Sequence, residues 1–221
     1  MKLTPRLALA ARLSAGGKRI LDIGCDHAYL SIALVQGGAE HAYASDLRPG
    51  PLAAARANIA ALGLESRITP VLSPGLEAFV PEDGDTLVMC GMWGELMVQI
   101  LESAPWALTG DHALVCQPMT HGDVLRQFFA GRGCAVEAEA LAREGDRLYT
   151  VLRARGGSAP YPAENFGLFT HLLLSDPAFP AFLQREKRRF SQALAGKRAA
   201  GLPTGSEEAI LARLEECSHG A

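Results

Sequence analysis

Runs of strand-forming residues alternate with runs of helix-forming residues between positions 19 and 155, and this alternation most constrains the fold. The connections are short, so successive strands should lie parallel in one sheet with helices packed against it. The alternation therefore predicts an α/β fold built from Rossmann-like βαβ units. The expected strands are residues 19–24, 41–46, 67–72, 85–90 and 113–117, and the expected helices are 29–36, 51–62, 95–103 and a segment ending near 131.

After this region, two strand-like segments at residues 135–141 and 147–153 follow one another without a helix between them. The residues that join them, Ala-Arg-Glu-Gly-Asp, have the composition of a turn. We expect a terminal hairpin whose last strand runs antiparallel to the rest of the sheet. This arrangement is typical of class I methyltransferase folds.

Gly156, Gly157, Ser158 and Pro160 mark a domain boundary. We expect a sheet domain over residues 1–157, led by a basic amphipathic helix, and a small helical domain over residues 158–221. The helices expected in the second domain are 163–175, 178–199 and 206–218. About sixty residues provide little for an independent core, so this domain should dock on the sheet domain or form a helical hairpin.

Charge is distributed unevenly along the chain. There are 21 basic and 24 acidic residues, and the formal net charge of −3 argues against a generic polyanion binder. Residues 1–19 contain five basic residues and no acid, and residues 185–198 contain six basic residues and one acid. Clustered Lys and Arg are typical of contacts with a phosphate backbone, and a solvated helix face has the same composition.

The cysteine and apolar patterns argue against several other classes of protein. The five cysteines are widely spaced and form no CxxC pair, which disfavours a zinc knuckle and a disulfide framework. They indicate a reducing, cytoplasmic compartment. No uncharged apolar run approaches the roughly 20 residues of a membrane helix. The histidines lack metal-ligand spacing, so we expect neither a membrane partner nor a metal.

The first expected strand ends at Gly24, and the second ends at Asp46, 22 residues further along the chain. A carboxylate about 20 residues after such a glycine typically binds the ribose hydroxyls of a nucleotide cofactor. Dinucleotide enzymes have Gly-x-Gly-x-x-Gly here, whereas this chain has one glycine followed by Asp26 and His27. An acid at this point repels a pyrophosphate and tolerates a cation. The pattern therefore favours S-adenosylmethionine, which has a sulfonium and no phosphate, over a nicotinamide dinucleotide.

The ends of the fourth and fifth strands should open onto the same crevice. The fourth strand continues into Cys-Gly-Met-Trp-Gly at residues 90–94, and the fifth ends in Gln-Pro-Met at residues 117–119. Trp93 could stack on a base or pack in the core, and Gln117 could bond a base edge or the backbone. His27 could accept a proton or cap the following helix.

These segments resemble the TrmK-type tRNA (adenine-N1)-methyltransferases. The resemblance rests on Asp-Ile-Gly-Cys-Asp-His-Ala-Tyr-Leu at residues 22–30, on residues 90–94 and on Gln117-Pro118. It extends to the basic N-terminal helix and to residues 181–187. It implies a class I fold with a C-terminal helical domain, S-adenosylmethionine as cofactor, and methylation of N1 of adenine 22 in tRNA. We expect a cytoplasmic monomer that acts on tRNA.

The resemblance also implies roles for individual side chains. Adenine N1 carries a free lone pair, so catalysis needs positioning and electrostatics rather than a strong base. Asp26 and Gln117 are the expected catalytic residues, and Tyr29 or Trp93 should stack the target base. The residues expected to contact the cofactor are Asp22, Gly24, His27, Asp46, Leu47, Gly75, Leu76, Cys90, Gly91 and Met92. The residues expected to contact tRNA phosphates are Lys2, Arg6, Arg12, Arg185, Lys187, Arg188 and Arg189.

Three departures from the family pattern fall in the expected crevice. Pro74 stands where the family has a carboxylate expected to hold the adenine amine of the cofactor, Trp93 replaces a glycine, and Met119 replaces an asparagine. Cys25 and Ser31 stand where the family has a serine and a proline. Two alternatives therefore stay open: a catalytically impaired RNA-binding homologue, and a methyltransferase for another RNA or a small molecule.

Overall fold

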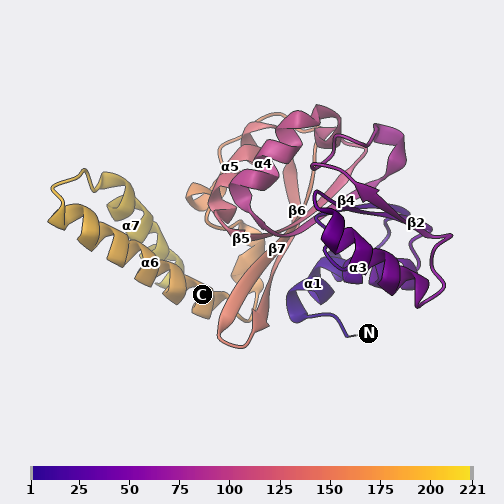
Figure 1. The fold of residues 1–221 in the computed structure, drawn as a ribbon. Helices are drawn as coiled ribbons and strands as arrows, with labels where there is room; N and C mark the ends of the chain where they lie inside the picture. Colours follow the sequence, from indigo (N-terminus) through magenta and orange to yellow (C-terminus); the bar gives the residue numbers. More distant parts are fainter. Residues whose placement is uncertain (1, 220–221) are drawn as a thin grey trace.

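A seven-stranded mixed sheet forms the centre of the molecule, with strand order β3-β2-β1-β4-β5-β7-β6 (Figure 1). The computed structural model describes residues 2–219. The first five strands are parallel, and β7 runs antiparallel to both β5 and β6. The predicted α/β fold with a terminal hairpin is therefore confirmed. The strands are β1 (Arg19–Ile23), β2 (His41–Asp46), β3 (Ile68–Leu72), β4 (Thr86–Trp93), β5 (Ala113–Thr120), β6 (Ala135–Glu144) and β7 (Arg147–Arg155).

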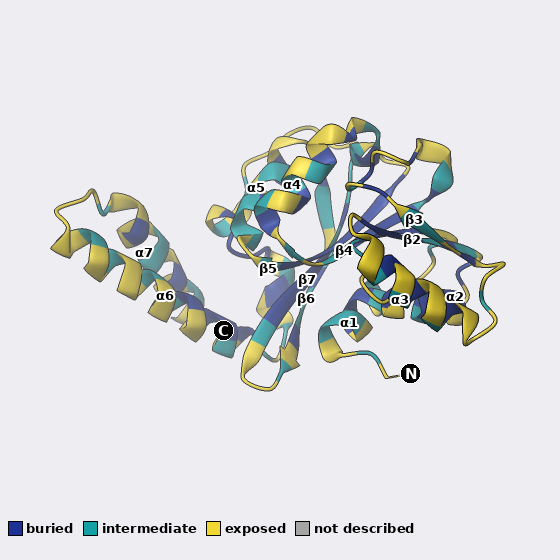
Figure 2. Cartoon of the chain, in the orientation of Figure 1, coloured by how far each residue is buried: buried dark blue, intermediate teal, exposed yellow. Residues whose placement is uncertain are grey.

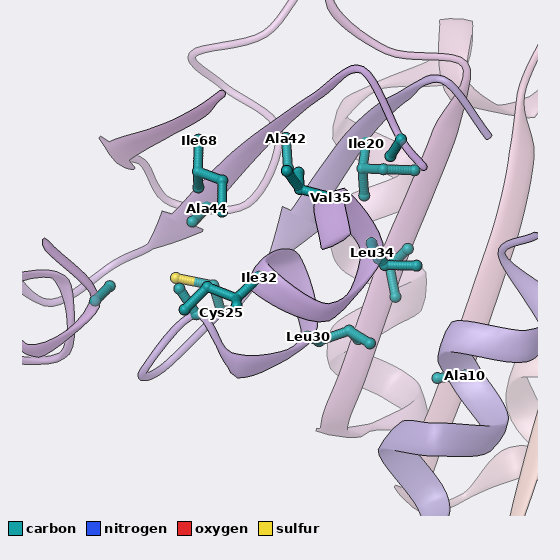
Figure 3. Packing of buried hydrophobic residues seen from close by; sticks show 14 of the residues in the cluster. Ala10, Ile20, Cys25, Leu30, Ile32, Leu34, Val35, Ala42, Ala44 and Ile68 are labelled. Carbon is teal, nitrogen blue, oxygen red and sulfur yellow. The ribbon is translucent and has the colours of Figure 1, made fainter. Parts of the chain in front are cut away.

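Helices cover both faces of this sheet. On one face, α1, α2 and α3 share a buried core with side chains such as Ile20 and Ala42 of the strands (Figure 3). On the other face, α4 and α5 pack Met97, Leu101 and Phe129 against strand residues such as Leu21. Because side chains alternate along a strand, the neighbours Ile20 and Leu21 serve opposite cores. The helices are α1 (Pro5–Leu13), α2 (Tyr29–Gln36), α3 (Pro49–Ala60), α4 (Gly94–Ser103) and α5 (Gly122–Gly131).

The C-terminal helices α6 (Phe179–Ala199) and α7 (Gly205–His219) form a hairpin that projects from the sheet (Figure 1). Most of its projecting surface is exposed (Figure 2). A third core, which includes Phe179, Phe182 and Leu214, lies at its base, and Leu141 and Leu148 of the β6–β7 hairpin pack against it. The helical hairpin is therefore attached to the sheet through apolar contacts with β6 and β7.

The prediction of a helix over residues 163–175 was wrong. This segment contains two short 3-10 turns, η3 (Glu164–Gly167) and η4 (His171–Ser175). Asn165 and Phe166 have φ angles of +47° and +58°, which a right-handed helix does not allow. Side chains of α5 hold this conformation: Gln127 Nε2 donates to the Phe166 carbonyl at 2.8 Å. Tertiary hydrogen bonds thus override the local helical pattern.

A buried ion pair connects α5, β6 and the segment before α6. Arg126 and Glu139 are bonded to each other, and their side chains are 5% and 0% exposed. Arg126 Nη1 also donates to the Gly167 carbonyl at 3.2 Å. The other carboxylate oxygen of Glu139 accepts from the backbone N–H and the hydroxyl of Thr170, at 2.8 and 2.7 Å. One carboxylate therefore ties the helical hairpin to the sheet.

Candidate active site

A cleft of about 810 Å³ opens at the carboxyl ends of β1, β2 and β4. In the sheet order, β1 lies between β2 and β4, so the chain changes direction across the sheet at this point, where open α/β sheets bind ligands. Most residues that the sequence placed in the site meet here. The lining includes Arg6, Asp22, Gly24, Asp26, His27, Tyr29, Asp46, Leu47, Gly75, Cys90, Gly91 and Met92.

The turn between β1 and α2 has three residues in the left-handed region of backbone conformation. Gly24, Asp26 and Ala28 all have positive φ, at +75°, +51° and +59°. The N–H groups of Gly24 and Cys25 both donate to the Ser45 carbonyl at 2.8 Å. The positive φ favours glycine at position 24, where a Cβ would lie 2.3 Å from Met92 Cε and would displace the end of that flexible side chain. The backbone of this turn can therefore approach a ligand closely.

Asp46 ends β2 and is aimed by the backbone around it. The residue is 7% exposed. One carboxylate oxygen accepts from the N–H of Arg48 at 2.9 Å, and the other accepts from the N–H of Asp26 at 3.3 Å. The carboxylate thus links the ends of β1 and β2 at the cleft wall. This is the position from which an acid can bind two vicinal hydroxyls.

Asp22 is the most deeply buried acid of the cleft, with 2% of its surface exposed. Its Oδ2 accepts hydrogen bonds from the hydroxyl and the N–H of Ser31, at 2.5 and 3.2 Å. Burial raises the pKa of Asp22 from 3.8 to about 6, although the Ser31 bonds lower it. Within residues 2–219, no cationic side chain forms an ion pair with it.

The raised pKa of Asp22 predicts how stability changes with pH. Folding raises this pKa, so the group favours the folded state below about pH 4 and that contribution is lost as pH rises through about 6. The Asp22→Asn variant lacks the titration. Its free energy of unfolding, relative to wild type, should therefore increase by about 2 to 3 kcal/mol between pH 4 and pH 8. Urea unfolding of both proteins across this range measures the difference, and a constant difference would contradict the prediction.

The thiols in this region are poor nucleophiles. Cys25 is buried in the core beneath the turn, and Cys90 is half-buried at the end of β4. Burial raises the pKa of both thiols above their ordinary value, and the charge of Asp22 raises both further. Reactive cysteines have lowered pKa values, so neither thiol is set up for attack.

Three of the residues predicted to act in catalysis, cofactor binding or base stacking lie outside the cleft lining. Leu76 is 2% exposed and packs in the core beneath α4. Trp93 is 66% exposed on the surface. Gln117 is fully buried, where its Oε1 accepts from the Gly91 N–H at 3.1 Å and its Nε2 donates to the Pro118 carbonyl at 3.0 Å. Of the two partners that the sequence analysis offered for Gln117, a base edge or the backbone, the structure therefore shows the backbone.

The basic residues divide among three environments. Arg6 lines the cleft, whereas Lys2 and Arg12 are exposed on and before α1. Arg185 and Arg189 line a second cleft of about 320 Å³ between α6, the end of β5 and the start of β7. Both of these arginines pair with the buried Glu186, at 2.9 and 3.0 Å. Lys187 pairs with Glu215 of α7 at 2.8 Å, and Arg188 is exposed. The predicted basic run is therefore partly neutralised.

One wall of the cleft was missed by the sequence analysis. Leu96, Gln99, Ile100 and Ser103 of α4 line it. Their spacing of i, i+3, i+4 and i+7 marks one helix face, which was the signal available in the sequence. Within residues 2–219, no group of three metal-binding side chains was found, and no helix is long and apolar enough to cross a membrane.

Comparison with known proteins places this cleft in a family. Residues 3–152 match the family described as a methyltransferase domain. A tRNA (adenine(22)-N(1))-methyltransferase of Bacillus subtilis (strain 168) is 31% identical over 188 residues, which cover 85% of this chain and 77% of that protein.

Solved structures agree with the sequence match. The Bacillus subtilis M1A22 tRNA methyltransferase TrmK is 27% identical with a TM-score of 0.80, covering 97% of this chain and 95% of that one. A Streptococcus pneumoniae protein in complex with S-adenosyl-L-methionine is 28% identical with a TM-score of 0.84, covering 98% of this chain and 99% of that one. The resemblance seen in the sequence motifs is confirmed, and the chain belongs to the tRNA (adenine(22)-N1)-methyltransferase family.

Proposed function

We propose that this protein transfers a methyl group from S-adenosylmethionine to N1 of adenine 22 in tRNA. The observation that carries the proposal is the pair of buried carboxylates, Asp46 and Asp22, in one cleft with the open Gly24 turn. Two acids suit a ligand with a ribose, an ammonium and a sulfonium, and they oppose a pyrophosphate. The family relationship supports the same donor and the same target.

The cofactor would lie across the strand ends. Asp46 would hold the ribose, and the backbone of Gly24 and of residues 90–92 would allow close approach. At the adenine end, Pro74 offers no polar side chain, but Ser73, Glu77 and Gln99 also line the cleft. The loss of the family's carboxylate at position 74 therefore leaves polar partners within the same wall.

The target base would enter from the open side of the cleft. Tyr29 is 41% exposed, and its ring stacks on His27 with centroids 5.5 Å apart. We assign this pair, with the exposed Trp93, to stacking of the target adenine or its neighbour. Asp26 is exposed at the turn and would accept a hydrogen bond from the exocyclic amine while its charge stabilises the methylated ring. N1 lies on the Watson–Crick edge, so the adenine must be unpaired or flipped out.

We assign the remaining basic residues to contacts with the tRNA backbone. We also propose that the chain divides into a catalytic domain (1–157) and a helical domain (158–221), and that both domains contact the tRNA. Lys2 and Arg12 on the N-terminal side and Arg188 on α6 are exposed cations. The helical hairpin projects from the sheet and could lie along an RNA (Figure 1). The five free cysteines support a cytoplasmic location, and we propose a monomer.

The decisive experiment is a methylation assay. Purified protein, S-adenosylmethionine and unmodified bacterial tRNA should produce 1-methyladenosine, detected by mass spectrometry after digestion to nucleosides. The Asp26→Ala variant should lose about 100-fold in kcat while it retains cofactor binding. Tyr29→Phe, which keeps the ring, is the matched control. Absence of the product despite tRNA binding would contradict the proposal and support the RNA-binding alternative.

Affinity for tRNA should fall steeply with salt. Each phosphate contact releases bound counterions, so several contacts should cost roughly 100-fold in affinity between about 50 and 200 mM salt. The double variant Lys2→Ala/Arg12→Ala should reduce the slope of log affinity against log salt by about two. Arg132→Ala, which follows α5 at the opposite edge of the sheet, should leave the slope unchanged. Filter binding measures both, and a flat salt response in the wild type would exclude the backbone role.

A further inference from the structure

Arg6 occupies an unexpected position for a residue of a basic N-terminal helix. Its side chain is 26% exposed and lines the cofactor cleft together with Asp22, Cys90 and Met119. Its backbone N–H donates to Glu144 Oε1 at 2.9 Å, which fixes the start of α1 to the β6–β7 hairpin. Lys2 and Arg12, in contrast, are exposed to solvent. Arg6 therefore faces the cleft rather than the outer surface.

The charge of Arg6 is poorly compensated in this position. Its Nε is buried without a hydrogen-bond partner, and the nearest carboxylate oxygen, Glu144 Oε1, lies 3.7 Å away. Nη1 donates to the Met119 sulfur at 3.1 Å, which is a weak acceptor. The guanidinium also lies over the Tyr149 ring, 5.4 Å from its centroid. A guanidinium has five N–H donors, so most of its hydrogen-bonding capacity is unused.

An acid without a cationic partner lies in the same part of the cleft. Asp22 and Arg6 both act on the thiol of Cys90, whose pKa Asp22 raises and Arg6 lowers, so both charges lie near the end of β4. The two form no ion pair with each other in the described part of the chain. This part of the cleft thus holds an acidic side chain, Asp22, and a cationic side chain, Arg6, that a single ligand could pair. A ligand that carries a cation and an anion on neighbouring atoms would match these two side chains.

We propose that Arg6 binds the carboxylate of the methionine portion of S-adenosylmethionine, while Asp22 faces its ammonium group. The inference rests on the proposed function and moves Arg6 from the tRNA contacts to the cofactor site. Asp46 lies at the end of β2 and would hold the ribose, which leaves the region of β1, β4 and α1 for the amino-acid end. Arginine suits a carboxylate because its planar fork can donate two parallel bonds. Helix α1 is then a wall of the cofactor site.

Two nucleoside ligands separate this role from a general effect on the cleft. S-adenosylhomocysteine carries the amino-acid group, whereas 5′-methylthioadenosine has the same adenine, ribose and thioether without it. Binding of each to the apoprotein is measured by isothermal titration calorimetry. Arg6→Met should weaken S-adenosylhomocysteine by about 10- to 100-fold, the range for a hydrogen bond to a charged group, and leave 5′-methylthioadenosine within about twofold. Arg6→Lys should restore part of the affinity, and Arg132→Met, at the opposite edge of the sheet, should leave the binding of both nucleosides unchanged.

Three outcomes would overturn the inference. Equal weakening of both ligands in Arg6→Met would mean that Arg6 acts only through packing of α1. Unchanged binding of S-adenosylhomocysteine together with weaker tRNA binding would return Arg6 to the phosphate contacts. If Arg6→Met does not fold, Arg6→Gln, which also removes the charge, carries the same comparison, and an unchanged preference for S-adenosylhomocysteine would exclude the role. Failure of the wild type to bind either nucleoside would instead reject the proposed function, and this inference with it.

Discussion

Replacement of Glu139 by alanine is expected to lower the free energy of unfolding by about 3 to 5 kcal/mol. The Glu139 side chain is fully buried and accepts hydrogen bonds from Arg126 and Thr170. Removal of the carboxylate leaves the Arg126 charge buried without its partner, and it leaves the Thr170 N–H without an acceptor. Because Thr170 begins the segment with η4 that leads into α6, the C-terminal hairpin should also lose part of its attachment. Urea unfolding followed by circular dichroism measures the loss.

A double variant provides the control for this effect. Arg126→Met/Glu139→Leu removes both charges and keeps apolar volume, so it should recover a large part of the stability lost in Glu139→Ala. Limited proteolysis should release α6 and α7 faster in the single variant than in the double variant. If the free energy of unfolding of the single variant falls by less than about 1 kcal/mol, which is the range of an exposed ion pair, this carboxylate does not stabilise the attachment of the hairpin as proposed.

Replacement of Asp46 by alanine is expected to weaken S-adenosylmethionine binding by at least about 100-fold. The carboxylate is 7% exposed and aimed into the cleft by the N–H groups of Arg48 and Asp26. Two hydrogen bonds from ribose hydroxyls to a charged acceptor contribute about 1.5 to 3 kcal/mol each, and loss of the side chain removes both. Isothermal titration calorimetry measures the change in affinity.

A pair of nucleosides tests whether this loss comes from the ribose. Wild type should prefer adenosine over 2′,3′-dideoxyadenosine in competition with S-adenosylhomocysteine, and Asp46→Ala should lose that preference. Glu77→Ala removes another carboxylate from the cleft lining without removing the one at the end of β2, so the preference should persist. A preference that survives in Asp46→Ala would place the ribose elsewhere.

The local sequence pattern was sufficient to predict the helices and strands at the centre of the fold. The predicted bounds of α2 and β2 agree with the structure, and β1 ends one residue earlier than predicted. These elements are short apolar runs bounded by glycine or charge, and both their burial and their ends follow from nearby residues. The family motif and the spacing of Gly24 and Asp46 belong to this same local information.

Long-range contacts decided the parts that the sequence analysis missed. Strands β4 and β5 continue to Trp93 and Thr120, past the predicted ends, because they pair with each other across an irregular register. Asn165 and Phe166 leave the helical region because the Phe166 carbonyl and the Asn165 side chain accept hydrogen bonds from side chains of α5 and α7. Each of these outcomes depends on a partner far away along the chain.

By itself, the sequence determined the α/β class, the terminal hairpin, the family and the acids that meet at the strand ends. These follow from the alternation of strands and helices and from the fixed geometry of parallel strands, whose carboxyl ends share one edge. Only the tertiary structure decided that Arg6 faces the cofactor cleft, that the Gln117 side chain forms hydrogen bonds with the backbone, and that Glu139 connects the helical hairpin to the sheet. Charge and residue type are written in the sequence, but solvent exposure and the nearest partner exist only once distant segments have packed together.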